Sequence, residues 1–109
     1  MSFFHNGREI LTDNEGFLKN KEDWSVELME YMAKQDNLTL TLEHKLVIET
    51  VQHYYEEYAT TPPIRGLITL LKKQGHPELN SIALAVLFPE GAAKTAARYA
   101  GLPKPAKCI

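Results

Sequence analysis

Residues 41–58, with the sequence TLEHKLVIETVQHYYEEY, carry the longest helical pattern in the chain. Apolar side chains recur there at helical spacing and spread beyond one face. They are Val47, Val51, Tyr54 and Tyr58, flanked by Leu46, Ile48 and Tyr55. Thr41 stands before the first apolar residue, where a hydroxyl can cap the helix. We therefore predict a helix over 42–58, buried on more than one side and central to a helical bundle.

Toward the amino terminus, a second helical pattern covers residues 21–35, with Asn20 as the expected cap. Trp24 begins its apolar stripe, which continues through Leu28, Tyr31 and Met32. Trp24 is either a core residue or a binding-site aromatic, and its spacing favours the core. Before this helix, Asn6-Gly7 separates two short runs within residues 3–11, a pair typical of a type I′ turn. The pattern predicts a small hairpin.

Toward the carboxyl terminus, three more helices are expected. Thr61 precedes Pro62-Pro63 and should cap a helix that ends before Gly75. A short helix over 82–88, capped by Asn80 or Ser81, is apolar almost all round and should be buried. The last helix, residues 92–100, is rich in alanine and permits close helix approach. The predicted fold is mostly α with a small N-terminal β-hairpin (α+β), a compact bundle of about five helices with a flexible C-terminal arm.

The composition limits the functional classes. A chain of 109 residues forms one compact domain, so we expect a single domain over 1–109. The sequence has no long apolar run and no signal-peptide pattern, which predicts a cytoplasmic protein without membrane contact. One cysteine and four scattered histidines offer no metal-ligand spacing, so we expect neither a metal nor a cofactor.

Charge is divided unevenly along the chain. Residues 1–60 hold 12 acidic and 5 basic side chains, a balance of −7, whereas residues 61–109 hold 2 and 7, a balance of +5. From Gly91 onward the chain has four lysines or arginines and no acidic side chain. This segment could steer the terminus toward an acidic protein surface or an RNA backbone. Because the whole chain is acidic, we favour protein partners.

The only cysteine, Cys108, is the penultimate residue of the sequence GLPKPAKCI at residues 101–109. Glycine closes the last helix and the prolines favour an extended path, so residues 101–109 should form an arm. Seven extended steps would carry the sulfur roughly 20 Å from Gly101. A thiol attacks as its thiolate, and Lys104 and Lys107 could favour that form. The alternative is a disordered terminus with an incidental cysteine.

These residues resemble a known family, the DsrC/TusE sulfur carriers. The resemblance covers essentially the whole chain and rests on LFPEGAAK at 87–94, AGLPKPAKCI at 100–109, Asp23-Trp24, TPPIR at 61–65 and Asn80-Ser81. Ala92 departs from the proline usual in the family, a change at a helix start. Members that partner dissimilatory sulfite reductase have a second cysteine where this chain has Ala97, and the TusE branch does not. The chain resembles the TusE branch.

The resemblance implies a sulfurtransferase that acts as a persulfide carrier. Cys108 would accept sulfur from a donor complex similar to TusBCD and pass it to a tRNA 2-thiouridylase for 2-thiolation of the wobble uridine. The tRNA itself would be contacted only indirectly. Arg65, at a helix start, could receive the terminal carboxylate or a persulfide, or could simply form a surface ion pair.

Other interpretations stay open. A DsrC-like carrier in dissimilatory sulfur metabolism, associated with sulfite reductase, is the nearest alternative. A non-catalytic interaction module whose tail docks as an extended peptide is another. Residues 64–88 also suggest a helix-turn-helix regulator, but residues 81–88 lack the polar side chains that read base edges.

Overall fold

The structure is a computed structural model that describes residues 1–105. Within that range, five α-helices and a two-stranded antiparallel hairpin confirm the predicted fold class. The elements are β1 (Ser2–His5), β2 (Arg8–Leu11), a 3₁₀ turn η1 (Lys21–Asp23), α1 (Val26–Gln35), α2 (Leu42–Tyr58), α3 (Ile64–Lys73), α4 (Ser81–Leu87) and α5 (Ala92–Tyr99). No helix of the described part is long and apolar enough to cross a membrane.

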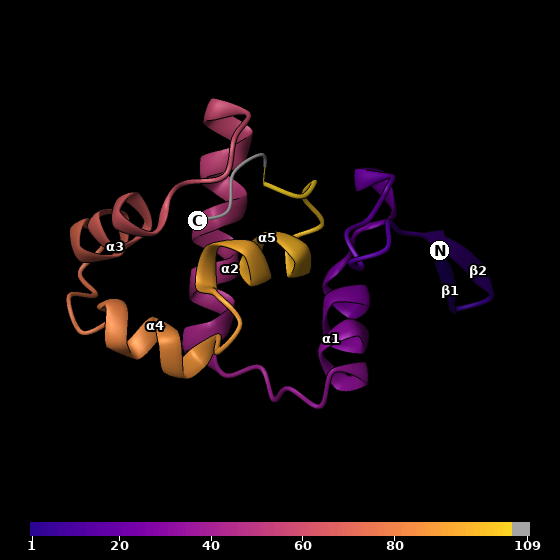
Figure 1. Ribbon diagram of the computed structural model, residues 1–109, viewed down its shortest axis with the longest axis horizontal. Coiled ribbons are helices and arrows are strands. Elements are labelled where there is room, and N and C mark those ends of the chain that lie inside the picture. The colour runs from indigo at the N-terminus through magenta and orange to yellow at the C-terminus, as the bar shows by residue number, and fades with distance from the viewer. Residues whose placement is uncertain (106–109) are drawn as a thin grey trace.

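Helix α5 occupies the middle of the molecule and contacts each of the other four helices (Figure 1). The hairpin lies at one end of the long axis, beyond α1, and α3 and α4 lie at the other. Ala93, Ala96 and Ala97 are buried, as the alanine pattern predicts. Because these side chains are small, α5 can approach its neighbours closely from several sides. The central position predicted for α2 is therefore shared with α5.

Helix α2 has the predicted bounds. Thr41 Oγ1 accepts a hydrogen bond from the His44 backbone N–H at 3.2 Å, and His44 Nδ1 accepts one from the Thr41 N–H at 3.1 Å. The other ring nitrogen of His44 lies 2.8 Å from the Leu87 carbonyl, which ties the start of α2 to the end of α4. Val47 and Val51 are fully buried, but Tyr58 is 57% exposed, so the predicted stripe ends before the last turn.

The first helix begins later than predicted. Residues 21–23 form only a 3₁₀ turn, Trp24 is extended, and α1 starts at Val26 with Ser25 as its cap. The Asn20 side chain makes no capping hydrogen bond, whereas Ser25 Oγ accepts from the Leu28 N–H at 3.0 Å. Of the two residues suited to cap this helix, Ser25 does so and Asn20 does not. Trp24 still packs against the core, but from outside the helix.

The third and fourth helices differ from prediction in detail. Helix α3 is preceded by Pro63 and not by Thr61, and Pro62 lies buried before it. Asn80 caps α4 by accepting from the Ala83 N–H at 3.0 Å. The predicted burial of α4 is wrong: Ile82 and Val86 are each 74% exposed, because α4 packs through Leu84 on one face.

The hairpin forms as predicted. Asn6 and Gly7 have φ of 52° and 78°, the positive pair that a type I′ turn requires. Phe3 pairs with Ile10 across the two strands, and its ring stacks on Tyr31 of α1 at 5.8 Å between centroids. Since an isolated hairpin is marginal in water, this contact, the buried Ile10 and the ion pair of Arg8 with Asp23 together secure it to the rest of the molecule.

Candidate functional site

The described chain ends in a short segment that leads toward Cys108. Cys108 and Lys107 lie outside the described residues, so the predicted thiol site and its nearest cation stay predictions. Residues 101–105 are described, and they show how the tail leaves the globule. Gly101 and Leu102 are buried, whereas Pro103 and Lys104 are exposed. The exposed part of the tail therefore starts at Pro103.

A left-handed glycine closes α5, as the sequence predicts. Gly101 has φ of +77°, and the Leu102 N–H donates to the Ala97 carbonyl at 3.0 Å. The Gly101 N–H donates to the Arg98 carbonyl at 3.2 Å. This pattern satisfies the last carbonyls of the helix and turns the chain sharply. The buried Leu102 side chain then fixes the direction in which Pro103 follows.

Two side chains from distant parts of the sequence hold this turn. Trp24 Nε1 donates to the Tyr99 carbonyl at 2.7 Å, and Gln52 Nε2 donates to the Ala100 carbonyl at 3.1 Å. Gly101 packs so closely on the indole of Trp24 that no side chain fits between them. Trp24 is therefore half-buried against the core, although not through the helical spacing predicted for it, and it also holds the turn that leads to the tail. Gln52 has no signal in the sequence that marks this role.

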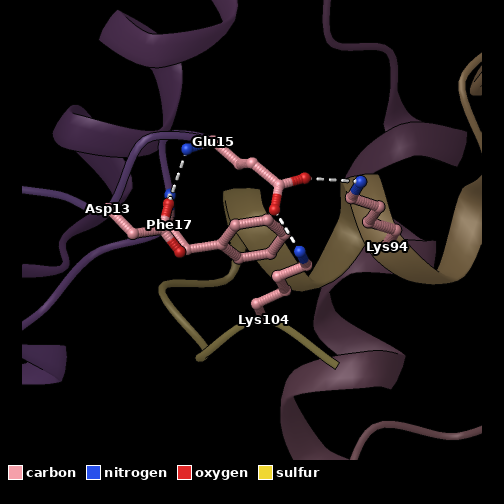
Figure 2. A network of polar contacts seen from close by, with 5 residues as sticks. All are labelled: Asp13, Glu15, Phe17, Lys94 and Lys104. Carbon is pink, nitrogen blue, oxygen red and sulfur yellow. Dashed lines mark hydrogen bonds and ion pairs between the residues drawn. The ribbon is translucent and has the colours of Figure 1, made fainter. Parts of the chain in front are cut away.

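One carboxylate joins α5, the tail and the loop after the hairpin. Glu15 Oε1 accepts from Lys94 Nζ at 2.8 Å, and Glu15 Oε2 forms an ion pair with Lys104 Nζ (Figure 2). Hydrogen bonds from Lys104 and Lys94 lower the pKa of Glu15 to about 2. The carboxylate is thus ionised at any pH near neutrality. Sequence reasoning missed Glu15, because both of its partners lie at the opposite end of the chain.

A second acidic residue binds the same helix. Asp36 Oδ2 accepts from the Tyr99 hydroxyl at 2.6 Å and from Arg98. Burial opposes ionisation of Asp36, but the hydrogen bonds from Arg98 and Tyr99 outweigh it and lower the pKa of that carboxyl. Burial, reinforced by the hydrogen bond to Asp36, raises the pKa of the Tyr99 phenol. Two carboxylates of the first half, Glu15 and Asp36, therefore pair with three of the four cations expected to make the terminal segment positive, and Glu15 is shared by two of them.

Arg65 lies on the first turn of α3 and is exposed. No ion pair joins it to another residue in the part of the chain that the structure describes. The structure does not bring it together with Lys104, and its predicted role stays a prediction. The same residues, 1–105, contain no cluster of three or more His, Cys, Asp or Glu side chains that could hold a metal ion.

The fold and the tail define a class: a small helical protein with an N-terminal hairpin, whose last helix leads by a fixed turn to a penultimate cysteine. The family model described as DsrC like protein matches residues 4–109, and the chain belongs to this family. Sulfurtransferase TusE of Yersinia pseudotuberculosis is 47% identical over 104 residues, which cover 94% of this chain and 96% of the relative.

Two solved structures have the same fold over the whole length of both chains. The NMR structure of DsrC from Allochromatium vinosum has a TM-score of 0.86 at 45% sequence identity. The crystal structure of the oxidized gamma-subunit of the dissimilatory sulfite reductase (DsrC) from Archaeoglobus fulgidus has a TM-score of 0.89 at 36% identity. The family resemblance of the sequence is thus confirmed.

Proposed function

We propose that this chain is a sulfur carrier that takes up a persulfide sulfur on Cys108. The observation that carries the proposal is the penultimate position of the only cysteine, in a chain whose relatives at 43–47% identity are called sulfurtransferases. The turn at residues 99–102 supports it, because a rigid base allows a short tail to present its thiol in a limited region of space. A carrier needs one exposed nucleophile and no bound cofactor.

The transfer is an exchange between sulfur atoms. The Cys108 thiolate attacks the outer sulfur of a donor cysteine persulfide, a new S–S bond forms, and the bond between that sulfur and the donor cysteine breaks. The donor cysteine leaves as a thiolate, and Cys108 becomes the persulfide, with no net oxidation or reduction. An acceptor then removes the outer sulfur in the same way, which returns the Cys108 thiolate.

By similarity to the TusE relatives, the donor is a relay complex similar to TusBCD, and the acceptor is a tRNA 2-thiouridylase that modifies the wobble uridine. Lys94 and Arg98 are engaged by Glu15 and Asp36, which makes these two cations less available to a phosphate backbone. This supports contact with protein partners and only indirect contact with tRNA.

A carrier role linked to sulfite reductase is the second candidate. The 45% identity to the Allochromatium vinosum DsrC is within the range found for the TusE relatives, so identity does not separate the two. Ala97 is fully buried in α5, and it stands where sulfite reductase partners of the family carry a second cysteine. A chain without that thiol cannot form an internal disulfide, which favours the single-thiol relay.

Intact-protein mass spectrometry tests the proposal. The protein is incubated with a cysteine desulfurase, cysteine and the relay proteins, and wild type is compared with Cys108→Ser. We expect a gain of one sulfur atom in wild type and none in the variant. If the relay proteins are loaded, the thiol still alkylates and no sulfur is gained, the proposal is wrong for these donors. Thiolated tRNA, formed when the thiouridylase and tRNA are added, then identifies the acceptor of the loaded carrier.

A further inference from the structure

The loop that carries Glu15 is held in one shape. Asp13 Oδ1 accepts from the backbone N–H groups of Glu15 at 2.8 Å and Phe17 at 3.0 Å. The Asp13 N–H donates to the Phe17 carbonyl at 2.9 Å, and the Phe17 side chain is buried at 2% exposure. Figure 2 shows these two residues beneath the Glu15 side chain. The loop therefore presents the Glu15 carboxylate at a fixed place beside α5.

Glu15 uses its two oxygens for two different segments. Oε1 accepts from Lys94, which belongs to α5, and Oε2 pairs with Lys104, which belongs to the tail (Figure 2). Lys94 thus keeps the carboxylate against the helix, and the second oxygen stays directed at the tail. Because the pKa of Glu15 is about 2, its carboxylate is ionised throughout the physiological pH range.

Lys104 is four residues before Cys108, a distance of roughly 12 Å in extended chain. Pro103 restricts the backbone on the amino side of Lys104, and Pro105 restricts it on the carboxyl side. A contact that fixes the Lys104 side chain therefore limits the directions in which the remaining residues can continue.

We propose that Glu15 is a positioning residue that orients the tail through Lys104 and so sets where Cys108 is presented to its partners. This rests on the proposed carrier function, but the orientation of the tail can be measured without sulfur transfer. The pair is exposed, so its effect is modest and sensitive to salt. A change of about two- to fivefold in the fraction of oriented tails is what an exposed ion pair provides.

A spin label on Cys108, the only cysteine, reports on the tail directly. The variants are Glu15→Gln, Lys104→Gln and, as a matched control, Lys94→Gln, which removes the α5 cation and leaves the pair with Lys104. We expect Glu15→Gln and Lys104→Gln to lower the immobilised fraction of the label about two- to fivefold at physiological salt. Lys94→Gln should change it far less, and high salt should bring wild type toward Glu15→Gln. An unchanged spectrum in Glu15→Gln, or an equal effect of Lys94→Gln, overturns the proposal.

Exchanging the charges of residues 15 and 104 distinguishes a direct contact between them from a general effect of charge on the tail. Glu15→Lys alone should release the tail. The double variant Glu15→Lys/Lys104→Glu should restore immobilisation, because the carboxylate introduced at position 104 would then face two ammonium groups. The thermal midpoint should stay the same in all variants. Failure of the exchange to restore the spectrum contradicts a direct contact.

Sulfur transfer then tests the consequence for the carrier. A tail that is oriented less often binds its donor less often, so Glu15→Gln should raise the KM for the carrier about two- to fivefold and leave kcat unchanged. Partial misfolding would instead lower kcat without a change of KM. A lower KM in Glu15→Gln would show that the pair restrains the tail from its partner, which overturns the proposal. If no variant accepts sulfur, the carrier function fails while the spin-label result still stands.

Discussion

Gly101 is the position at which one added methyl group should do most damage. A Cβ built on Gly101 lies 2.6 Å from Trp24 Cδ1 and 2.7 Å from Trp24 Cβ and Cγ, far inside van der Waals contact. The indole cannot simply move away, because its Nε1 donates to the Tyr99 carbonyl at 2.7 Å. The backbone is also left-handed at this residue, with φ of +77°.

The expected loss of stability has two parts. Alanine in the left-handed region costs about 1 kcal/mol relative to glycine. Overpacking against a fixed side chain adds about 1–3 kcal/mol. We therefore expect Gly101→Ala to lower the free energy of unfolding by about 2–4 kcal/mol. For a domain of this size that corresponds to a fall of roughly 10–25 °C in Tm.

Gly75→Ala is the matched control. Gly75 also has positive φ, +91°, but nothing lies within 4 Å of a Cβ built there, so only the backbone part applies. Urea denaturation followed by circular dichroism should show a loss of about 1 kcal/mol in Gly75→Ala. Equal losses in the two variants would refute the steric argument. If the argument holds, Trp24→Ala combined with Gly101→Ala should cost less than the two single changes together.

Three further changes should be measured by urea denaturation. His44→Ala removes the acceptor for the Thr41 N–H and the contact with the Leu87 carbonyl, so it should lower the free energy of unfolding by about 2 kcal/mol. An unchanged free energy of unfolding would show that His44 does not stabilise the junction between α2 and α4. Ala59→Gly should stabilise by about 0.5–1 kcal/mol, because Ala59 ends α2 with φ of 56°. The fold lowers the pKa of Asp36, so its ionised carboxylate adds to the free energy of unfolding fully above the unfolded pKa of 3.8, and this stabilisation is lost as the pH falls toward the folded pKa. Asp36→Asn should therefore lose less stability than wild type over that pH range. Identical profiles of stability against pH in the two proteins would contradict this.

Local signals explain which elements can be predicted from the sequence. Thr41 and the apolar stripe define α2 to the residue, and Asn6-Gly7 defines the hairpin, because caps and turns act between near neighbours in the chain. The start of α1 is harder to predict, since Asn20 and Ser25 are both suitable caps and only Ser25 makes a side-chain capping hydrogen bond in the structure. The burial of α4 cannot be predicted in the same way, because composition does not show how many faces of a helix find a neighbour.

The candidate site can be predicted only in part, for a related reason. Gly101 and Cys108 are marked in the sequence by their types and their place after the last helix. Gln52 and Glu15 carry no such mark, since each acts on a residue that is distant in sequence. Periodicity predicts that a side chain faces inward or outward, but not which distant partner it meets.

The unequal charge of the two halves acts within the fold. Glu15 binds Lys94 and Lys104, and Asp36 binds Arg98, so acidic groups of the first half meet basic groups of the second at the base of the tail. These two carboxylates offset part of the positive charge of this segment where the tail begins. The attraction instead brings the loop after the hairpin against α5 and the tail, since opposite charges at these distances attract even in a partly exposed site. The charge division of the sequence is thus used within the fold, where it joins the loop after the hairpin to α5 and to Lys104.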